Sequence, residues 1–212
     1  MLILEAYRRD LARLSGRATI GRDDAAWLAA STLLERYAAA LPAERRALAP
    51  SLAAHLAAQG EDSVVAAGLR FASRLEDAGA LHLAAAWTAL LEQLGSEARP
   101  LDLGRVIAHR ARLVHKLGQP ETALALYERV ARLGETCAEP ELTTRAWNGI
   151  ALVAHVRGNH PDARRWYRAA ALVADDTGCV EQACIAHQGL LIVAAVARDF
   201  ALARTEGRRA LA

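Results

Sequence analysis

The stretch G-N-H-P-D-A-R-R-W-Y at positions 158–167 repeats the pattern of G-Q-P-E-T-A-L-A-L-Y at positions 118–127, at a spacing of 40. Both have a glycine at the first position, an alanine at the sixth and a tyrosine at the end. A fainter copy, R-D-F-A-L-A-R-T-E-G, starts at Arg198 after the same spacing, and a hairpin around Gly79 and Ala84 fits at a spacing of 39. Repetition at such a period predicts stacked helical hairpins.

Composition agrees with an all-α fold. Hydrophobic residues make up 53% of the chain and aromatic residues only 5%, because alanine and leucine supply most of the apolar content. Both are strong helix formers. Pro120 and Pro161 stand at the starts of second helices, where a missing N–H costs nothing. We expect one helical-repeat domain over residues 1–212, with a motif-less helical segment at 1–61 and repeats at 62–212.

The repeat resembles the tetratricopeptide repeat (TPR). Trp147 falls where that family often has tryptophan, and the other matches are the turn residues Gly118 and Gly158, the second-helix alanines Ala123, Ala163 and Ala203, and the aromatics Tyr127 and Tyr167. The third copy departs at Arg198 and Gly207, and the period of 40 exceeds the family's usual 34, as in the longer variants of bacterial regulators and motor light chains. The resemblance implies an all-α, right-handed α-solenoid of antiparallel helical hairpins.

Charge and targeting signals restrict the function classes. The formal net charge of +2 is too small to indicate binding to nucleic acid or to a membrane surface. Three scattered cysteines make no disulfide framework, and the N-terminus has no signal-peptide apolar region because Glu5 interrupts it. The longest nearly uncharged stretch, 184–197, is too short to span a bilayer. We expect a soluble, cytoplasmic protein.

Motifs for catalysis or cofactor binding are missing from the sequence. It contains no nucleophile elbow, phosphate-binding loop or dinucleotide fingerprint. Cys184 and His187 lie one helical turn apart, but no second pair of metal ligands stands nearby, so ordinary helix packing explains them better than zinc. The four tryptophans are interpreted as core between hairpins rather than as stacking platforms. We therefore expect no enzyme activity, no cofactor and no metal.

The resemblance also implies a binding groove, because the first helix of each hairpin lines the concave face in the family. Carried over position by position, the groove residues are Arg105, Arg112, His115, Lys116, Arg145, Asn148, His155, Ile185, Gln188 and Ile192. Helical spacing independently puts those of residues 105–116 on roughly one face. The groove is expected to be basic at one end and apolar toward Ile185 and Ile192. The alternative interpretation is that the arginines form a solvated surface.

These residues favour a protein- or peptide-binding scaffold whose partner segment is acidic with an apolar anchor. The family's carboxylate clamp for chaperone C-termini does not match, since Ala108, Gly149 and Gly189 replace its polar residues. The alternatives are a ligand-sensing part of a larger bacterial regulator and, less favoured, a helical-repeat nucleic-acid binder. Ala210 and Leu211 leave the last helix without a polar cap, which suggests a longer array or self-association through that end.

The motif register can be tested at Ala163. Replacing this alanine with leucine should overpack the contact between hairpins and lower the free energy of unfolding by roughly 1–3 kcal/mol. Urea denaturation followed by circular dichroism measures the change. Wild-type stability in Ala163→Leu would show that the register is wrong.

Overall fold

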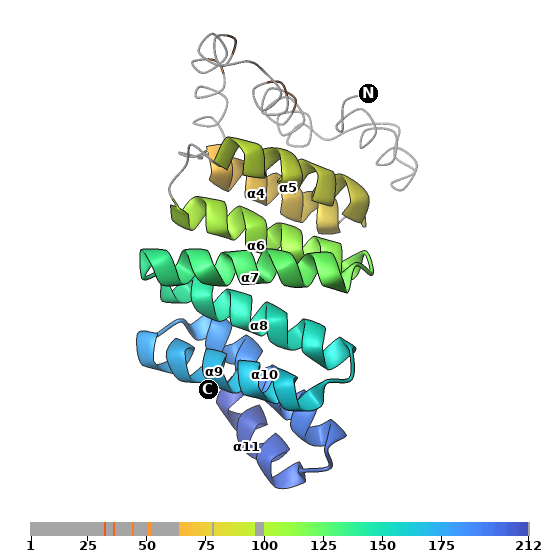
Figure 1. Ribbon diagram of the computed structural model, residues 1–212, viewed down its shortest axis with the longest axis vertical. Coiled ribbons are helices and arrows are strands. Elements are labelled where there is room, and N and C mark those ends of the chain that lie inside the picture. The colour runs from red at the N-terminus through yellow and green to blue at the C-terminus, as the bar shows by residue number, and fades with distance from the viewer. Residues whose placement is uncertain are drawn as a thin grey trace. The chain divides into compact units, whose positions relative to one another are not determined.

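The computed structural model describes residues 64–77, 79–95 and 100–211, together with the single positions 32, 36, 44 and 51. This portion of the chain contains eight helices and no strand (Figure 1). They are α4 (Val64–Asp77), α5 (Leu81–Gly95), α6 (Pro100–Lys116), α7 (Pro120–Cys137), α8 (Pro140–Val156), α9 (His160–Thr177), α10 (Val180–Val196) and α11 (Phe200–Ala210). The predicted all-α class of helical hairpins is confirmed, whereas the motif-less segment expected at 1–61 lies almost entirely outside the described residues.

The chain divides into two compact units, Met1–Leu113 and Val114–Ala212. In the first unit, α4 packs on α5 across the turn at Gly79, as the spacing of 39 predicts. Trp87 is fully buried there, donates its indole N–H to the carbonyl oxygen of Gly68 at 2.8 Å and meets Phe71 edge to face. The single-domain organisation expected from the sequence stays a prediction.

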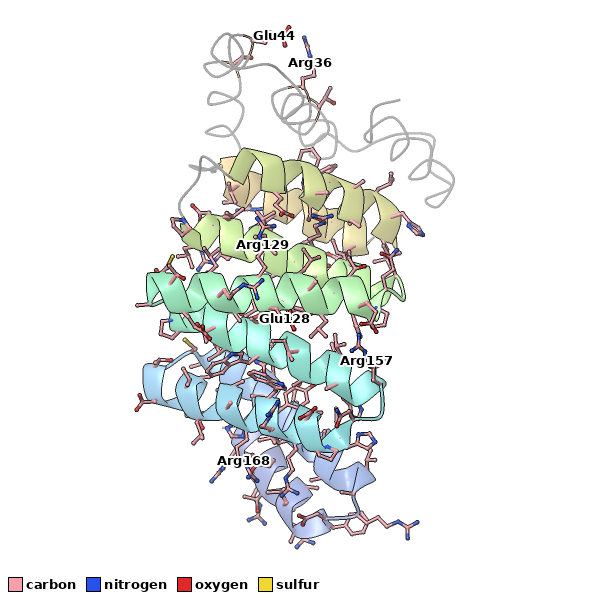
Figure 2. The ribbon with its side chains drawn as sticks, in the orientation of Figure 1. Arg36, Glu44, Glu128, Arg129, Arg157 and Arg168 are labelled. Atoms are coloured by element: carbon pink, nitrogen blue, oxygen red, sulfur yellow. The ribbon has the colours of Figure 1, made fainter. Side chains whose placement is uncertain are left out.

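In the second unit, each helix from α7 to α11 packs on the next one, and α8 also contacts α10 (Figure 1). Side chains fill the space between successive helices (Figure 2). The first helices of neighbouring hairpins, α8 and α10, therefore lie side by side.

The turns inside the hairpins repeat in geometry as well as in sequence. Gly118 and Gly158 both adopt a φ of 77°, in the left-handed region that glycine enters without steric cost. Arg198 takes the same place in the third copy with a φ of 59°, although an arginine is strained there. Asn159 and Asp199 follow two of these turns and cap α9 and α11 by accepting backbone N–H groups. The turn thus persists where its glycine is lost.

Two tyrosines lock neighbouring hairpins together. The ring of Tyr127 lies directly over Gly149, and that of Tyr167 lies over Gly189, so that a Cβ atom at either glycine would clash with the ring. Both tyrosines are buried, and burial raises the pKa of Tyr167 to about 12, which keeps its phenol uncharged. Ala151 and Ala163 are fully buried in one hydrophobic cluster with Tyr167. These contacts agree with the core positions predicted from the motif.

In the last hairpin, a large residue replaces the small alanine of the first helix, and a glycine replaces the tyrosine of the second helix. Leu191 stands where the previous hairpins have Ala111 and Ala151, and Gly207 stands where they have tyrosine. The nearest atom to a Cβ built at Gly207 is the flexible tip of Leu191, at 2.9 Å. A large side chain on α10 therefore takes some of the space that a tyrosine on α11 would fill.

The tyrosine–glycine contact predicts a large difference between two glycine substitutions. Gly189→Ala should lower the free energy of unfolding by roughly 1–3 kcal/mol, because the added methyl group forces the buried Tyr167 ring to move. Gly207→Ala is the matched control: it should be neutral or stabilise by up to about 1 kcal/mol, since alanine favours helix and Leu191 can yield. Urea unfolding of both variants measures this. Equal effects would mean that the rings do not set the distance between hairpins.

Candidate functional site

An exposed face on α8 and α10, here named the α8/α10 face, is the candidate site of the second unit. Its α10 portion consists of Glu181, Ile185, Gln188, Ile192 and Val196, which follow one another at intervals of three or four residues and so share one side of the helix. Ile185, Ile192 and Val196 are 40%, 48% and 53% exposed. Its α8 portion holds Arg145, Leu152 and Val156, of which Val156 is 61% exposed. Apolar side chains thus face water on both helices.

The two isoleucines are specific to the last hairpin. The position of Ile185 is occupied by arginine in both preceding hairpins, as Arg105 and Arg145. The position of Ile192 is occupied by Arg112 and then by Leu152. The repeat fold itself therefore does not require isoleucine at either place.

Two arginines of the predicted groove, Arg112 and Arg145, form ion pairs with carboxylates. Arg145 bridges Glu141 at 3.3 Å and Glu181 at 3.1 Å, which ties α8 to α10. Arg112 lies 2.7 Å from Glu76 on α4. Both positive charges are thus offset locally, and the groove is less basic than the sequence suggests. Arg105 and Arg112 belong to the first unit, so the α8/α10 face is defined within the second unit alone.

Asn148 is buried in the structure, whereas the sequence predicts it in an open groove. It is 5% exposed, and its side-chain N–H₂ donates to the backbone oxygen of Gln182 at 3.0 Å and to that residue's side-chain oxygen at 3.2 Å. Gln182 is 1% exposed on α10. The prediction that Asn148 lines an open groove is wrong, because its side chain is buried and its N–H₂ group bonds to Gln182 between α8 and α10. Sequence reasoning missed Gln182 altogether.

The remaining predicted residues lie at the ends of helices or on the exposed side of α10. His115 is half-buried at the end of α6, and burial lowers its pKa, so it is uncharged at pH 7. His155 is half-buried, with its ring 5.2 Å from that of His160. Lys116 and Gln188 are exposed. His115 therefore adds little positive charge to the predicted groove.

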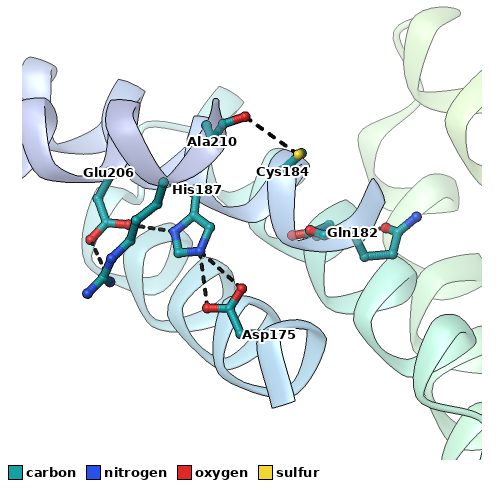
Figure 3. A network of polar contacts seen from close by, with 8 residues as sticks. Asp175, Gln182, Cys184, His187, Glu206 and Ala210 are labelled. Carbon is teal, nitrogen blue, oxygen red and sulfur yellow. Dashed lines mark hydrogen bonds and ion pairs between the residues drawn. The ribbon is translucent and has the colours of Figure 1, made fainter. Parts of the chain in front are cut away.

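A buried polar cluster on the other side of α10 joins the last three helices (Figure 3). His187 is 4% exposed; its Nδ1 lies 2.6 Å from Glu206 on α11 and its Nε2 lies 3.2 Å from Asp175 on α9. Glu206 is itself buried and also contacts Arg209 at 3.4 Å. Both ring nitrogens are engaged, so the cluster offers no free base.

This cluster replaces an aromatic pair of the preceding repeat. Trp147 and Trp166 lie one repeat period before His187 and Glu206, and their rings pack 6.1 Å apart against the buried cluster around Tyr167. This agrees with the interpretation of these tryptophans as core between hairpins. The carboxylates around His187 were missed, although the alignment of Trp166 with Glu206 at the repeat spacing contains the signal.

Metal and membrane sites find no support in the described residues. They contain no group of three or more His, Cys, Asp or Glu side chains placed to hold a metal ion. None of the helices described is both long and apolar enough to cross a membrane.

Comparisons with known proteins identify the fold. No protein-family model matches the chain, and no curated protein matches it in sequence. Among solved structures, BtubC (BKLC) from P. vanneervenii is similar with a TM-score of 0.66 and 16% identity over 91% of this chain and 73% of that one. Aspartyl phosphate phosphatase F from Bacillus subtilis is similar with a TM-score of 0.65 and 12% identity over 88% of this chain and 49% of that one. The chain has a TPR-like helical-repeat fold.

The buried pair of His187 and Glu206 predicts non-additive mutant effects. His187→Leu alone leaves Glu206 buried without the histidine and should destabilise by about 3–5 kcal/mol. The double variant His187→Leu/Glu206→Leu removes both polar groups and should be more stable than His187→Leu. Arg209→Ala, which removes an exposed partner of Glu206, should cost about 0–1 kcal/mol. Denaturant unfolding of the three variants tests this, and additive losses would contradict it.

Proposed function

We propose that the chain is a protein-binding module of the tetratricopeptide repeat family and that its α8/α10 face receives a segment of a partner protein. The observation that carries this proposal is the exposure of Ile185 and Ile192 at positions where preceding hairpins have arginines or a half-buried leucine. Isoleucine at such places exposes apolar surface that the fold does not use. Aligned apolar groups of this kind mark interaction sites.

The apolar side chains supply the affinity in this proposal. Full burial of an isoleucine side chain contributes roughly 1.5–3 kcal/mol, so two or three such residues in line suffice for a specific contact. The bridge between Arg145 and Glu181 lies at one end of the stripe and presents both signs of charge. Charged groups at a rim orient a partner more than they tighten its binding. An apolar anchor therefore matters more than the acidic character expected from the sequence.

The proposal also assigns the chain no catalytic role. His187, the histidine with two carboxylate neighbours, is buried and engaged at both ring nitrogens. The residues of the α8/α10 face are apolar, amide or ion-paired. Binding without chemistry is what such a surface supports.

A second candidate is the ligand-sensing part of a larger bacterial regulator. Its support is the similarity to aspartyl phosphate phosphatase F, in which the matching region makes up 49% of a longer chain. A helical-repeat module of this size can therefore be one part of a bacterial protein with further segments. In that case the partner of the α8/α10 face is another segment of the same protein.

Substitution of the two isoleucines tests the binding proposal. Proteins retained by the wild-type chain from an extract of its source are identified, and binding of the purified partner is then measured by calorimetry. Ile185→Asp/Ile192→Asp should weaken that binding at least about tenfold, because charged groups would replace apolar side chains that the partner covers in the complex. Thermal unfolding should change little, since both positions are exposed.

Leu172→Asp is the matched control, because Leu172 is 67% exposed on α9, outside the α8/α10 face. It should bind the partner like the wild type. Equal binding by the double isoleucine variant would exclude the α8/α10 face as the interaction site.

A further inference from the structure

We propose that the α8/α10 face binds a second copy of this chain, with α10 packed antiparallel on α10 of that copy about a two-fold axis close to Gln188. This inference rests on the proposed function, since it names the partner of the same face. It goes beyond that function by fixing the stoichiometry, the direction and the register of the contact.

The first argument is the symmetric spacing of the exposed residues of α10. Ile185 and Ile192 lie at equal distances on either side of the midpoint between Gln188 and Gly189. In an antiparallel pair with its axis at this point, Ile185 of one copy meets Ile192 of the other, twice. A two-fold interface requires such self-complementarity.

The second argument is the periodicity of the seam. Ile185 and Ile192 are seven residues apart, with Gln188 between them and Val196 following, which is the spacing that packs two helices side by side. Gln188 is exposed and would meet its own counterpart at the axis. An amide carries both donors and an acceptor, so two such side chains can satisfy each other. One polar residue in an apolar seam also specifies its register.

The third argument is charge complementarity between the two ends of α10. Glu181, whose side chain is 70% exposed, stands in the first turn, and exposed Arg198 follows the last turn. Antiparallel packing brings the Glu181 end of one helix to the Arg198 end of the other, and it also aligns the helix dipoles favourably. The net charge of +2 imposes little repulsion between two copies.

The equivalent helix α8 lacks this self-complementarity. At the positions of Ile185 and Ile192 it has Arg145 and Leu152, so an antiparallel α8 pair would put a charge against an apolar side chain. At the position of Gln188 it has the buried Asn148, which bonds to Gln182. The features required for self-association are therefore combined on α10.

Disulfide trapping tests the register directly. In a Cys137→Ser/Cys179→Ser/Cys184→Ser background that melts cooperatively, Gln188→Cys should form a covalent dimer under mild oxidation, because the two copies of this residue meet at the axis. Ile185→Cys should cross-link poorly with itself and efficiently when mixed with Ile192→Cys. Arg168→Cys is the control for random collision, since Arg168 is exposed on α9 (Figure 2). Cross-linking of Arg168→Cys as fast as Gln188→Cys would overturn the proposal.

Sedimentation equilibrium of the unmodified full chain provides the second readout. The wild type should dimerise, and Ile192→Asp should raise the dissociation constant at least tenfold, because each substitution acts twice in a two-fold interface. A wild-type chain that stays monomeric up to its solubility limit would overturn the proposal. That outcome leaves the proposed function intact if the double isoleucine variant still loses a different protein partner, so the two failures are distinguishable.

Discussion

The contact of a tyrosine ring with a glycine of the next hairpin sets the packing of the second unit. Tyr127 over Gly149 and Tyr167 over Gly189 place a large flat group against bare backbone, and no other residue type leaves that space. Because the two pairs are related by the repeat spacing, successive hairpins approach in the same way. Close packing allows little tolerance, so this contact determines which other side chains are buried.

The close approach of the hairpins also determines which polar side chains meet between them. Asn148 and Gln182 come together between α8 and α10, where the Asn148 N–H₂ group donates to both oxygens of Gln182. On the other side of α10, His187 and Glu206 occupy the place that Trp147 and Trp166 occupy one repeat earlier. One backbone arrangement thus accepts an aromatic pair or a hydrogen-bonded pair of histidine and glutamate. Such alternatives leave the fold unchanged and make each junction between hairpins chemically distinct.

The exposed side of α10 shows where function departs from the needs of the fold. Ion-paired arginines occupy two of the repeat-equivalent positions in α6 and α8, whereas α10 presents Ile185, Ile192 and Val196 to water. Core packing does not demand these residues, and the proposed partner surface accounts for their exposure. The self-complementary order of Ile185, Gln188 and Ile192 is the basis for the proposal that a second copy is the partner.

The sequence by itself determined the helical hairpins, because the turn at Gly118 and Gly158, the small Ala123 and Ala163 and the bulky Tyr127 and Tyr167 are local features that recur at a fixed distance. It also placed Ile185 and Ile192 on one face, since helical periodicity is readable without a structure. Tertiary structure alone decided the partners of the polar residues. Arg145 pairs with Glu181, Asn148 with Gln182 and His187 with Glu206, and the partners are separated by 19 to 36 residues in the sequence. Such pairings depend on the distance between neighbouring helices. That distance is set jointly by the sizes of side chains in several hairpins, so no single sequence motif predicts it.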